Sequence, residues 1–153
     1  MPGLSQRRKL FNNFLGLDFC FSEEAIDRII AVFYYSVNKP KNVIILLMSH
    51  IICLDVGGTN IRGALFKQND LQPIKLQKIS TQQAGQKVEE RICNLVKMLW
   101  PEDGTLSAIT IAAPGFVDAN NGMIIRAVNI PGWEYLPLMK IVEEKFGIPV
   151  FIE

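Results

Sequence analysis

The sequence predicts an α/β fold in which a mixed sheet is combined with two amphipathic helices. Short apolar segments of strand length recur after residue 50, and two longer segments place their apolar residues on one helical face. Glycine and proline separate most of these segments. In chain order the elements are β-β-β-α-β-α-β. This order predicts a three-stranded antiparallel meander that crossover helices extend.

The first two expected strands form a hairpin. Ile51 to Asp55 is a short run that is apolar up to its last residue, and residues 61–67 form the second strand. Val56-Gly57-Gly58-Thr59-Asn60 lies between them. A glycine pair between two such runs is typical of a tight turn, so the two strands are expected to pair directly.

The third strand and the first helix follow. Residues 71–79 alternate imperfectly, and Pro73 places this strand at a sheet edge because proline lacks the N–H that a central strand donates. A helix is expected over residues 88–99, since one face is apolar (Val88, Ile92, Leu95, Val96 and Leu99) and Pro101 ends it. Its charged residues are expected to form a solvated face: Lys87, Glu89, Glu90, Arg91 and Lys97.

The C-terminal third predicts a strand, a loop, a helix and a strand. Leu106 to Ala112 is a buried strand, after which residues 113–135 are expected to form a loop with a hairpin turn at Asn121-Gly122. A helix begins at Pro137 and ends at Gly147, because proline favours the first helical position and glycine the C-terminal stop. Pro149 to Ile152 is the final strand.

Length and composition limit the class of protein. The 153 residues are 49% apolar and 20% charged, which indicates one globular domain with a sizeable core. The 16 basic and 15 acidic residues leave a net charge of +1, so no overall field attracts nucleic acid or an anionic membrane. The longest apolar run, residues 43–48, is too short to span a bilayer. We therefore expect neither nucleic acid nor a membrane as a partner.

Residues 1–47 differ from the rest of the chain. Their one expected element is a helix at about residues 23–36, and they contain no motif, so they are interpreted as an appendage that is spurious or poorly ordered. Residues 48–153 form the expected domain. The three separated cysteines, Cys20, Cys53 and Cys93, match neither a metal site nor a disulfide framework, and we expect a cytoplasmic protein. His50, the one histidine, is expected at the surface.

Asp55-x-Gly57-Gly58-Thr59 is the sharpest functional signal. Two glycines let a ligand approach the backbone closely and leave N–H groups free to face phosphate oxygens. The carboxylate of Asp55 and the hydroxyl of Thr59 could order a hydrated Mg²⁺ ion. The alternative is a hairpin turn without a ligand, in which the glycines only supply positive φ. The spacing is neither that of a Walker loop nor that of a dinucleotide fingerprint.

Residues 52–66 resemble the first phosphate motif of the actin, hexokinase and Hsp70 superfamily; they read Ile-Cys-Leu-Asp-Val-Gly-Gly-Thr-Asn-Ile-Arg-Gly-Ala-Leu-Phe. Two later segments narrow the resemblance to the ROK family of bacterial sugar kinases and repressors. They are Ile111-Ala-Ala-Pro-Gly-Phe-Val-Asp118 and Asn129-Ile-Pro-Gly-Trp133. The glucokinase branch is the most similar. The resemblance covers about residues 48–153 and implies a ribonuclease-H-like fold.

The resemblance implies an ATP-dependent kinase that phosphorylates a hexose, with glucose as the first expectation and ATP and Mg²⁺ as cofactors. The residues that match the ATP phosphate and magnesium contacts are Asp55, Gly57, Gly58, Thr59 and Asn60. Gly115 and Phe116 match positions that offer backbone to the sugar, and Asn129 matches a side chain that meets a sugar hydroxyl. Gly115 and Asn129 are also ordinary turn residues, and Trp133 is expected to be a packing anchor.

The chain also departs from the family pattern. The family's general base, the aspartate of an Asn-Asp pair, would follow Glu153, and the second domain, the sugar-binding Glu and His and the cysteine zinc site lie further on. We therefore expect a truncated N-terminal lobe that is inactive alone and holds no catalytic residue and no metal site of its own. A homodimer is an expectation for the full-length protein only.

Two alternatives remain open. One is a ROK sugar-responsive transcriptional regulator, against which residues 1–47 argue because they predict one helix and no helix-turn-helix pair. The other is a non-catalytic lobe that serves as an interaction module.

Overall fold

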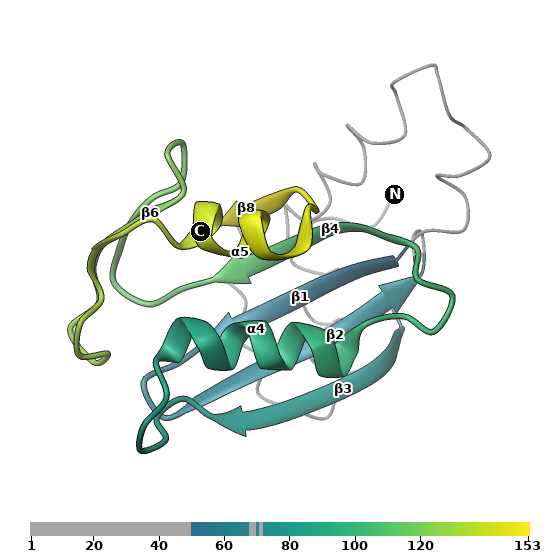
Figure 1. Ribbon diagram of the computed structural model, residues 1–153, viewed down its shortest axis with the longest axis horizontal. Coiled ribbons are helices and arrows are strands. Elements are labelled where there is room, and N and C mark those ends of the chain that lie inside the picture. The colour runs from purple at the N-terminus through teal and green to yellow at the C-terminus, as the bar shows by residue number, and fades with distance from the viewer. Residues whose placement is uncertain (1–49, 68–69, 71) are drawn as a thin grey trace, which may run out of the picture. The chain divides into compact units, whose positions relative to one another are not determined.

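A five-stranded mixed sheet forms the centre of the domain (Figure 1). The computed structural model describes residues 50–67, 70 and 72–153, so the helix expected at residues 23–36 lies outside the described residues. The strands of this sheet, in the spatial order β3-β2-β1-β4-β8, are β3 (Pro73–Ser80), β2 (Asn60–Lys67), β1 (His50–Val56), β4 (Leu106–Ala112) and β8 (Val150–Ile152).

The pairing of the strands agrees with the expected topology. β1 pairs antiparallel with β2, with Val56 opposite Ile61, and β2 pairs antiparallel with β3. β4 then joins β1 in parallel, and β8 joins β4 in parallel. Parallel neighbours need crossover connections, which α4 (Val88–Leu99) and α5 (Leu138–Phe146) supply. Pro73 is the first residue of the edge strand β3, as its missing N–H predicts.

Both helices pack on the same side of this sheet (Figure 1). Their apolar faces share one core with the side chains of Ile52, Leu54 and Ile109, all of which are fully buried. The rings of Trp100 and Phe146 stack with their centroids 5.6 Å apart, which joins the ends of the two helices. Gly147 ends α5 in the left-handed conformation, as predicted. Neither α4 nor α5 has the length and apolarity that a membrane-crossing helix requires.

The expectation of a loop over residues 113–135 is wrong. This segment forms a second sheet of three short antiparallel strands, β5 (Phe116–Asp118), β6 (Met123–Arg126) and β7 (Glu134–Leu136). The expected element order therefore lacks three strands, β5, β6 and β7. Strands of three or four residues are too brief to show an alternating pattern, and these pair only with one another. The turn at Asn121-Gly122 is confirmed, because it joins β5 to β6.

The expectation of a fully solvated charged face on α4 is wrong for Arg91. Its side chain is buried, with only 8% of the residue exposed. The guanidinium group donates through Nε to the Ser80 carbonyl oxygen at 2.7 Å and through Nη1 to the side-chain oxygens of Gln83 and Gln86. A buried charge is tolerated when hydrogen bonds replace its lost hydration, which is the case here.

Candidate functional site

The candidate site lies where the carboxyl ends of β1 and β4 meet. Asp55 is level with Ala112 in the parallel pair, and the arrows of the two strands point to the same edge of the sheet (Figure 1). β1 continues into residues 57–60, which we call the glycine turn, and β4 continues toward Gly115. Ligands commonly bind at the carboxyl edge of parallel strands in α/β sheets. The two predicted ligand motifs therefore leave the sheet at one edge.

The glycine turn offers fewer free amides than expected. The N–H of Gly57 donates to the Asn60 carbonyl oxygen at 2.9 Å and closes the hairpin, so the expectation that it faces a ligand is wrong. The N–H groups of Gly58 and Thr59 make no backbone hydrogen bond to any other described residue. Unpaired amides at the tip of a turn can bind an anion. The donors available to a phosphate are therefore those of Gly58 and Thr59.

Gly57 and Gly58 do not adopt positive φ in this turn. Neither Gly57 nor Gly58 is among the glycines with positive φ, so that premise of the ligand-free alternative is wrong. A Cβ atom added at Gly58 would lie 3.0 Å from the Cβ of Asn129. A side chain at position 58 would be crowded by Asn129, because the chain at Asn129 approaches Gly58 closely. The structure thus brings together Gly58 from the expected phosphate motif and Asn129 from the expected sugar motif.

Asp55 supplies the carboxylate of the site. It lies on β1, opposite Arg62 on β2, and its carboxylate Oδ2 is 3.8 Å from the Arg62 Nη1. Burial raises the pKa of Asp55, and the nearby positive charge of Arg62 opposes this rise only in part. A carboxylate that is costly to ionise gains from a further cation. A single carboxylate also fits Mg²⁺, which usually takes one or two protein ligands and completes its shell with phosphates and water.

Gly115 directly precedes β5 and Phe116 is its first residue, three and four residues after β4 ends. Gly115 has φ of 98°, and a Cβ atom there would lie 2.1 Å from the Arg126 carbonyl oxygen. Only glycine fits this position, so the turn interpretation of Gly115 has direct structural support. The backbone at Gly115 therefore lies close to Arg126, three residues before Asn129. Phe116 is 71% exposed, which leaves its backbone near the surface.

Thr81 is a site residue that the sequence did not single out. It follows the last residue of β3 and is fully buried. Its hydroxyl donates to the Gly57 carbonyl oxygen at 2.6 Å, and its N–H donates to the Thr59 carbonyl oxygen at 2.9 Å. The signal in the sequence was weak, because one threonine after an edge strand is ordinary and the contact spans 24 positions.

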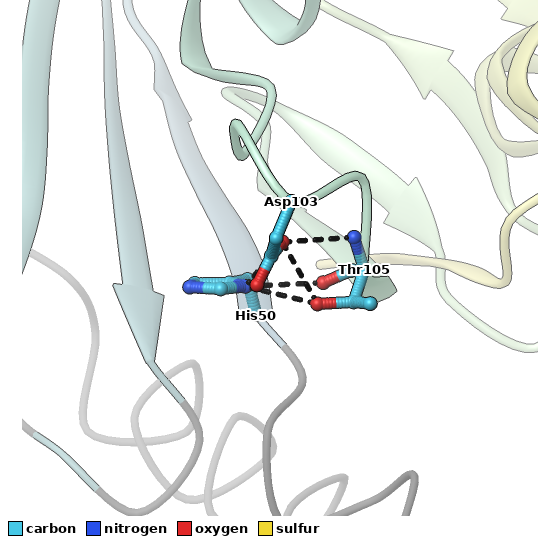
Figure 2. A network of polar contacts seen from close by, with 3 residues as sticks. All are labelled: His50, Asp103 and Thr105. Carbon is cyan, nitrogen blue, oxygen red and sulfur yellow. Dashed lines mark hydrogen bonds and ion pairs between the residues drawn. The ribbon is translucent and has the colours of Figure 1, made fainter.

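His50 lies at the opposite end of β1 from the glycine turn, in a network with Asp103 and Thr105 (Figure 2). Its side chain is 12% exposed, so it lies partly buried at the start of β1. Nδ1 lies 3.1 Å from the Thr105 carbonyl oxygen, and since a carbonyl can only accept, Nδ1 carries the proton. Nδ1 also lies 3.5 Å from Asp103 Oδ1. These contacts join β1 to the segment before β4, away from the site.

Trp133 and two cysteines lie in the interior. Trp133 is 2% exposed and belongs to the core, which confirms that it is a packing anchor. Cys53 and Cys93 are both buried and free. Burial raises the pKa of the Cys53 thiol to about 12, so this thiol is not a nucleophile at neutral pH. Within the part of the chain that the structure describes, no three His, Cys, Asp or Glu side chains gather to hold a metal ion.

Comparisons with known proteins identify the family of the chain. The family model described as the ROK family matches residues 51–153. A glucokinase of Halalkalibacterium halodurans is 34% identical over 106 residues, which cover 65% of this chain and 32% of the relative. A candidate xylose repressor of a Caldicellulosiruptor species is 30% identical over 124 residues, which cover 76% of this chain and 29% of the relative. The chain thus spans about a third of the length of these relatives.

A solved structure has the same fold. A ROK family glucokinase of Streptomyces griseus, in complex with glucose and AMPPNP, matches with a TM-score of 0.60 at 28% identity, over 69% of this chain and 33% of its own. The mixed sheet is therefore of the ribonuclease-H-like type that the resemblance implied. With a family model over two thirds of its residues and this shared fold, the chain belongs to the ROK family.

Proposed function

We propose that this chain is the N-terminal lobe of an ATP-dependent hexose kinase, with residues 48–153 as its nucleotide- and sugar-binding part and residues 1–47 as an appendage. One observation carries the proposal. The N–H groups of Gly58 and Thr59, which have no backbone partner among the described residues, follow the half-buried carboxylate of Asp55 within four positions at the carboxyl edge of the sheet. This combination suits a polyphosphate with its cation better than it suits a turn that only reverses the chain.

In this proposal the N–H groups of Gly58 and Thr59 bind phosphate oxygens of ATP. The Asp55 carboxylate and the Thr59 hydroxyl hold water molecules of the hydrated Mg²⁺ ion, and Asn60 borders the same site. When bound, Mg²⁺ neutralises the charge that develops on the transferred phosphoryl group. The raised pKa of Asp55 supports the proposal, because its carboxylate is only partly compensated by Arg62 and gains stability from a second cation.

The acceptor is proposed to be a hexose, with glucose as the first candidate. Asn129 would donate or accept at a sugar hydroxyl, and the backbone at Gly115 and Phe116 would border the ring. The close approach of Asn129 to Gly58 supports this assignment, because phosphoryl transfer requires the acceptor close to the phosphate that it attacks. The glucokinase from Streptomyces griseus, solved with glucose and AMPPNP, supports the same choice of substrates.

No residue among those described is proposed as the general base. Phosphoryl transfer depends on positioning and on a group that accepts the hydroxyl proton, and the family pattern supplies that group after Glu153. We expect the purified chain to bind MgATP without phosphorylating glucose above background. A titration with MgATP and a coupled assay of ADP release measure the two properties. Absence of MgATP binding would contradict the nucleotide site, and turnover that depends on Asp55 would contradict the missing base.

A second candidate function is sugar-responsive transcriptional regulation. The match to the candidate xylose repressor covers 76% of the chain, which is longer than residues 51–153 and therefore includes residues before Ile51. The match to the glucokinase covers 65%. A regulator of this kind would bind sugar through the Asn129 region and would have no use for the unpaired amides of the glycine turn. Binding of sugar without any binding of MgATP would favour this candidate.

We further propose the cytoplasm as the compartment and a homodimer as the state of the full-length protein. The buried, free thiols of Cys53 and Cys93 support a reducing compartment, because neither is used in a disulfide. ATP and a hexose are the proposed small-molecule partners.

A further inference from the structure

We propose that Thr81 is a positioning residue that sets the direction of the Gly58 N–H and so prepares the glycine turn for a polyphosphate. Its two hydrogen bonds reach both carbonyl groups that flank Gly58. The hydroxyl donates to the Gly57 oxygen at 2.6 Å, and the N–H donates to the Thr59 oxygen at 2.9 Å. Thr81 follows the end of β3 that lies beside the start of β2, since Ser80 pairs with Asn60. It therefore holds the glycine turn from the neighbouring strand.

The geometry of the peptide group turns these contacts into a direction for the amide. In a trans peptide the C=O and the N–H of one unit point to opposite sides, and all peptide bonds described here are trans. The C=O of Gly57 points toward Thr81, so the N–H of Gly58, in the same unit, points away from Thr81. The unit lies between two glycines, whose backbone rotates freely, and needs an external contact to keep its orientation.

Thr81 is itself held in place by the buried arginine of α4. Arg91 Nε donates to the carbonyl oxygen of Ser80, the residue before Thr81, at 2.7 Å. Its Nη1 donates to the side chains of Gln83 and Gln86, which follow Thr81. The core helix therefore holds the backbone directly before Thr81 and the side chains of two residues that follow it. This arrangement also gives a reason for the burial of a charged residue on that helix.

The proposal rests on the proposed nucleotide site and adds a residue to it that touches no ligand. Valine at position 81 has nearly the shape of threonine but cannot donate to the Gly57 oxygen, so the Gly57–Gly58 peptide unit loses its hydroxyl contact. Serine keeps the hydroxyl. Thr81→Val should therefore weaken binding of MgATP at least fivefold, and Thr81→Ser should bind it within twofold of the wild type.

The experiment compares the full chain with the variants Thr81→Val, Thr81→Ser and Thr110→Val. Thr110 is a matched control: it is a buried threonine of β4 that lies opposite Cys53 of β1, and its side chain interacts with that thiol and not with the glycine turn. Calorimetry measures the affinity for MgATP, and ¹H–¹⁵N spectra of the free proteins record the amide of Gly58. We expect Thr81→Val to shift or broaden that resonance, and Thr81→Ser and Thr110→Val to leave it close to the wild-type position.

The two readouts separate this proposal from the proposed function. If the wild type binds no MgATP, the nucleotide site is refuted, and the Gly58 resonance alone then decides whether Thr81 positions the turn. If Thr81→Val folds, binds MgATP as tightly as the wild type and leaves the Gly58 resonance unmoved, Thr81 positions nothing. A loss of affinity in Thr81→Val that Thr81→Ser does not restore would likewise overturn the role of the hydroxyl.

Discussion

Two hairpin turns of this domain satisfy their backbone groups in opposite ways. The turn between β5 and β6 is closed by its own side chains, since Asp118 accepts from the backbone N–H of Asn121 at 3.1 Å and from its side-chain amide at 2.7 Å. The glycine turn between β1 and β2 is held by Thr81, 24 residues away, and leaves the N–H groups of Gly58 and Thr59 without a backbone partner among the described residues.

The aspartates of the two turns, Asp118 and Asp55, have pKa values that are shifted in opposite directions. The hydrogen bonds from Asn121 lower the pKa of Asp118, so the fold favours its charged form. Burial raises the pKa of Asp55, so the fold disfavours its charged form. A turn that only reverses the chain can stabilise itself, whereas a turn that keeps donors and a carboxylate available needs support from elsewhere. This contrast is what distinguishes the candidate site from an ordinary hairpin.

The largest expected effect is on the stability of the turn between β5 and β6. Gly122 has φ of 63°, and a Cβ atom there would lie 2.3 Å from the Cβ of Met139 on α5. Gly122→Ala should therefore lower the free energy of unfolding by about 3 kcal/mol through backbone strain and overpacking. Chemical denaturation measures this loss. The folded Gly122→Ala protein should bind MgATP with wild-type affinity. A weaker affinity would show that the turn between β5 and β6 also contributes to nucleotide binding.

The next effect is on ligand binding at the glycine turn. Gly58→Val places a side chain where Asn129 approaches, and it covers the N–H groups proposed to bind phosphate. We expect at least a tenfold weaker affinity for MgATP, with a loss of about 1 kcal/mol in unfolding free energy because φ is not positive at this position. Nucleotide titration beside thermal melting measures both. A folded Gly58→Val protein with unchanged affinity would remove the phosphate role of the turn.

The smallest effect is on the pH dependence of stability. The pKa of Asp55 is raised in the folded protein, so protonated Asp55 stabilises the fold. This contribution is fully present at pH values below the ordinary pKa of 3.8 and is lost as the pH rises through the pKa of the folded state. Asp55→Asn should therefore stabilise the ligand-free protein at pH 7, by less than about 1 kcal/mol, while it weakens binding of MgATP. Thermal melting between pH 3 and pH 7, without ligand, follows the difference from wild type.

Asp118→Asn is the control for the pH series, with the opposite sign. The lowered pKa of Asp118 means that its contribution is present above 3.8 and is lost as the pH falls through the folded value. This variant should be less stable than the wild type at pH 7 and should approach it in acid. If Asp55→Asn and Asp118→Asn change the stability at pH 7 in the same direction, the two turns do not differ in how they treat their aspartates.

The sequence predicted the large elements well because their patterns are local. The strand over Leu106–Ala112 and the helix over Val88–Leu99 have the expected bounds, since continuous apolar runs, one apolar face and the adjacent Pro101 set them. The order of strands followed from a glycine turn and two crossover helices. The motif around Asp55 was visible because glycines, a hydroxyl and a carboxylate lie within five positions of each other.

Features that depend on distant contacts were not predictable in this way. Thr81 acquires its role only when β3 brings it beside the glycine turn, and Arg91 is buried only because three acceptors from residues 80–86 surround it. The amide of Gly57 was expected to be free, but the hairpin itself uses it. Local pattern identified the ligand-binding motif, whereas the hydrogen bonds that shape it required the folded chain.

The central claim is that the amides of the glycine turn bind phosphate and that those of the turn between β5 and β6 do not. A ¹H–¹⁵N titration of the full chain with MgATP tests it most directly, because one spectrum reports on both turns. The account predicts saturable shifts of the Gly58 and Thr59 resonances, while those of Asn121 and Gly122 stay within the noise. Stationary Gly58 and Thr59 resonances in a folded protein at saturating MgATP would contradict it.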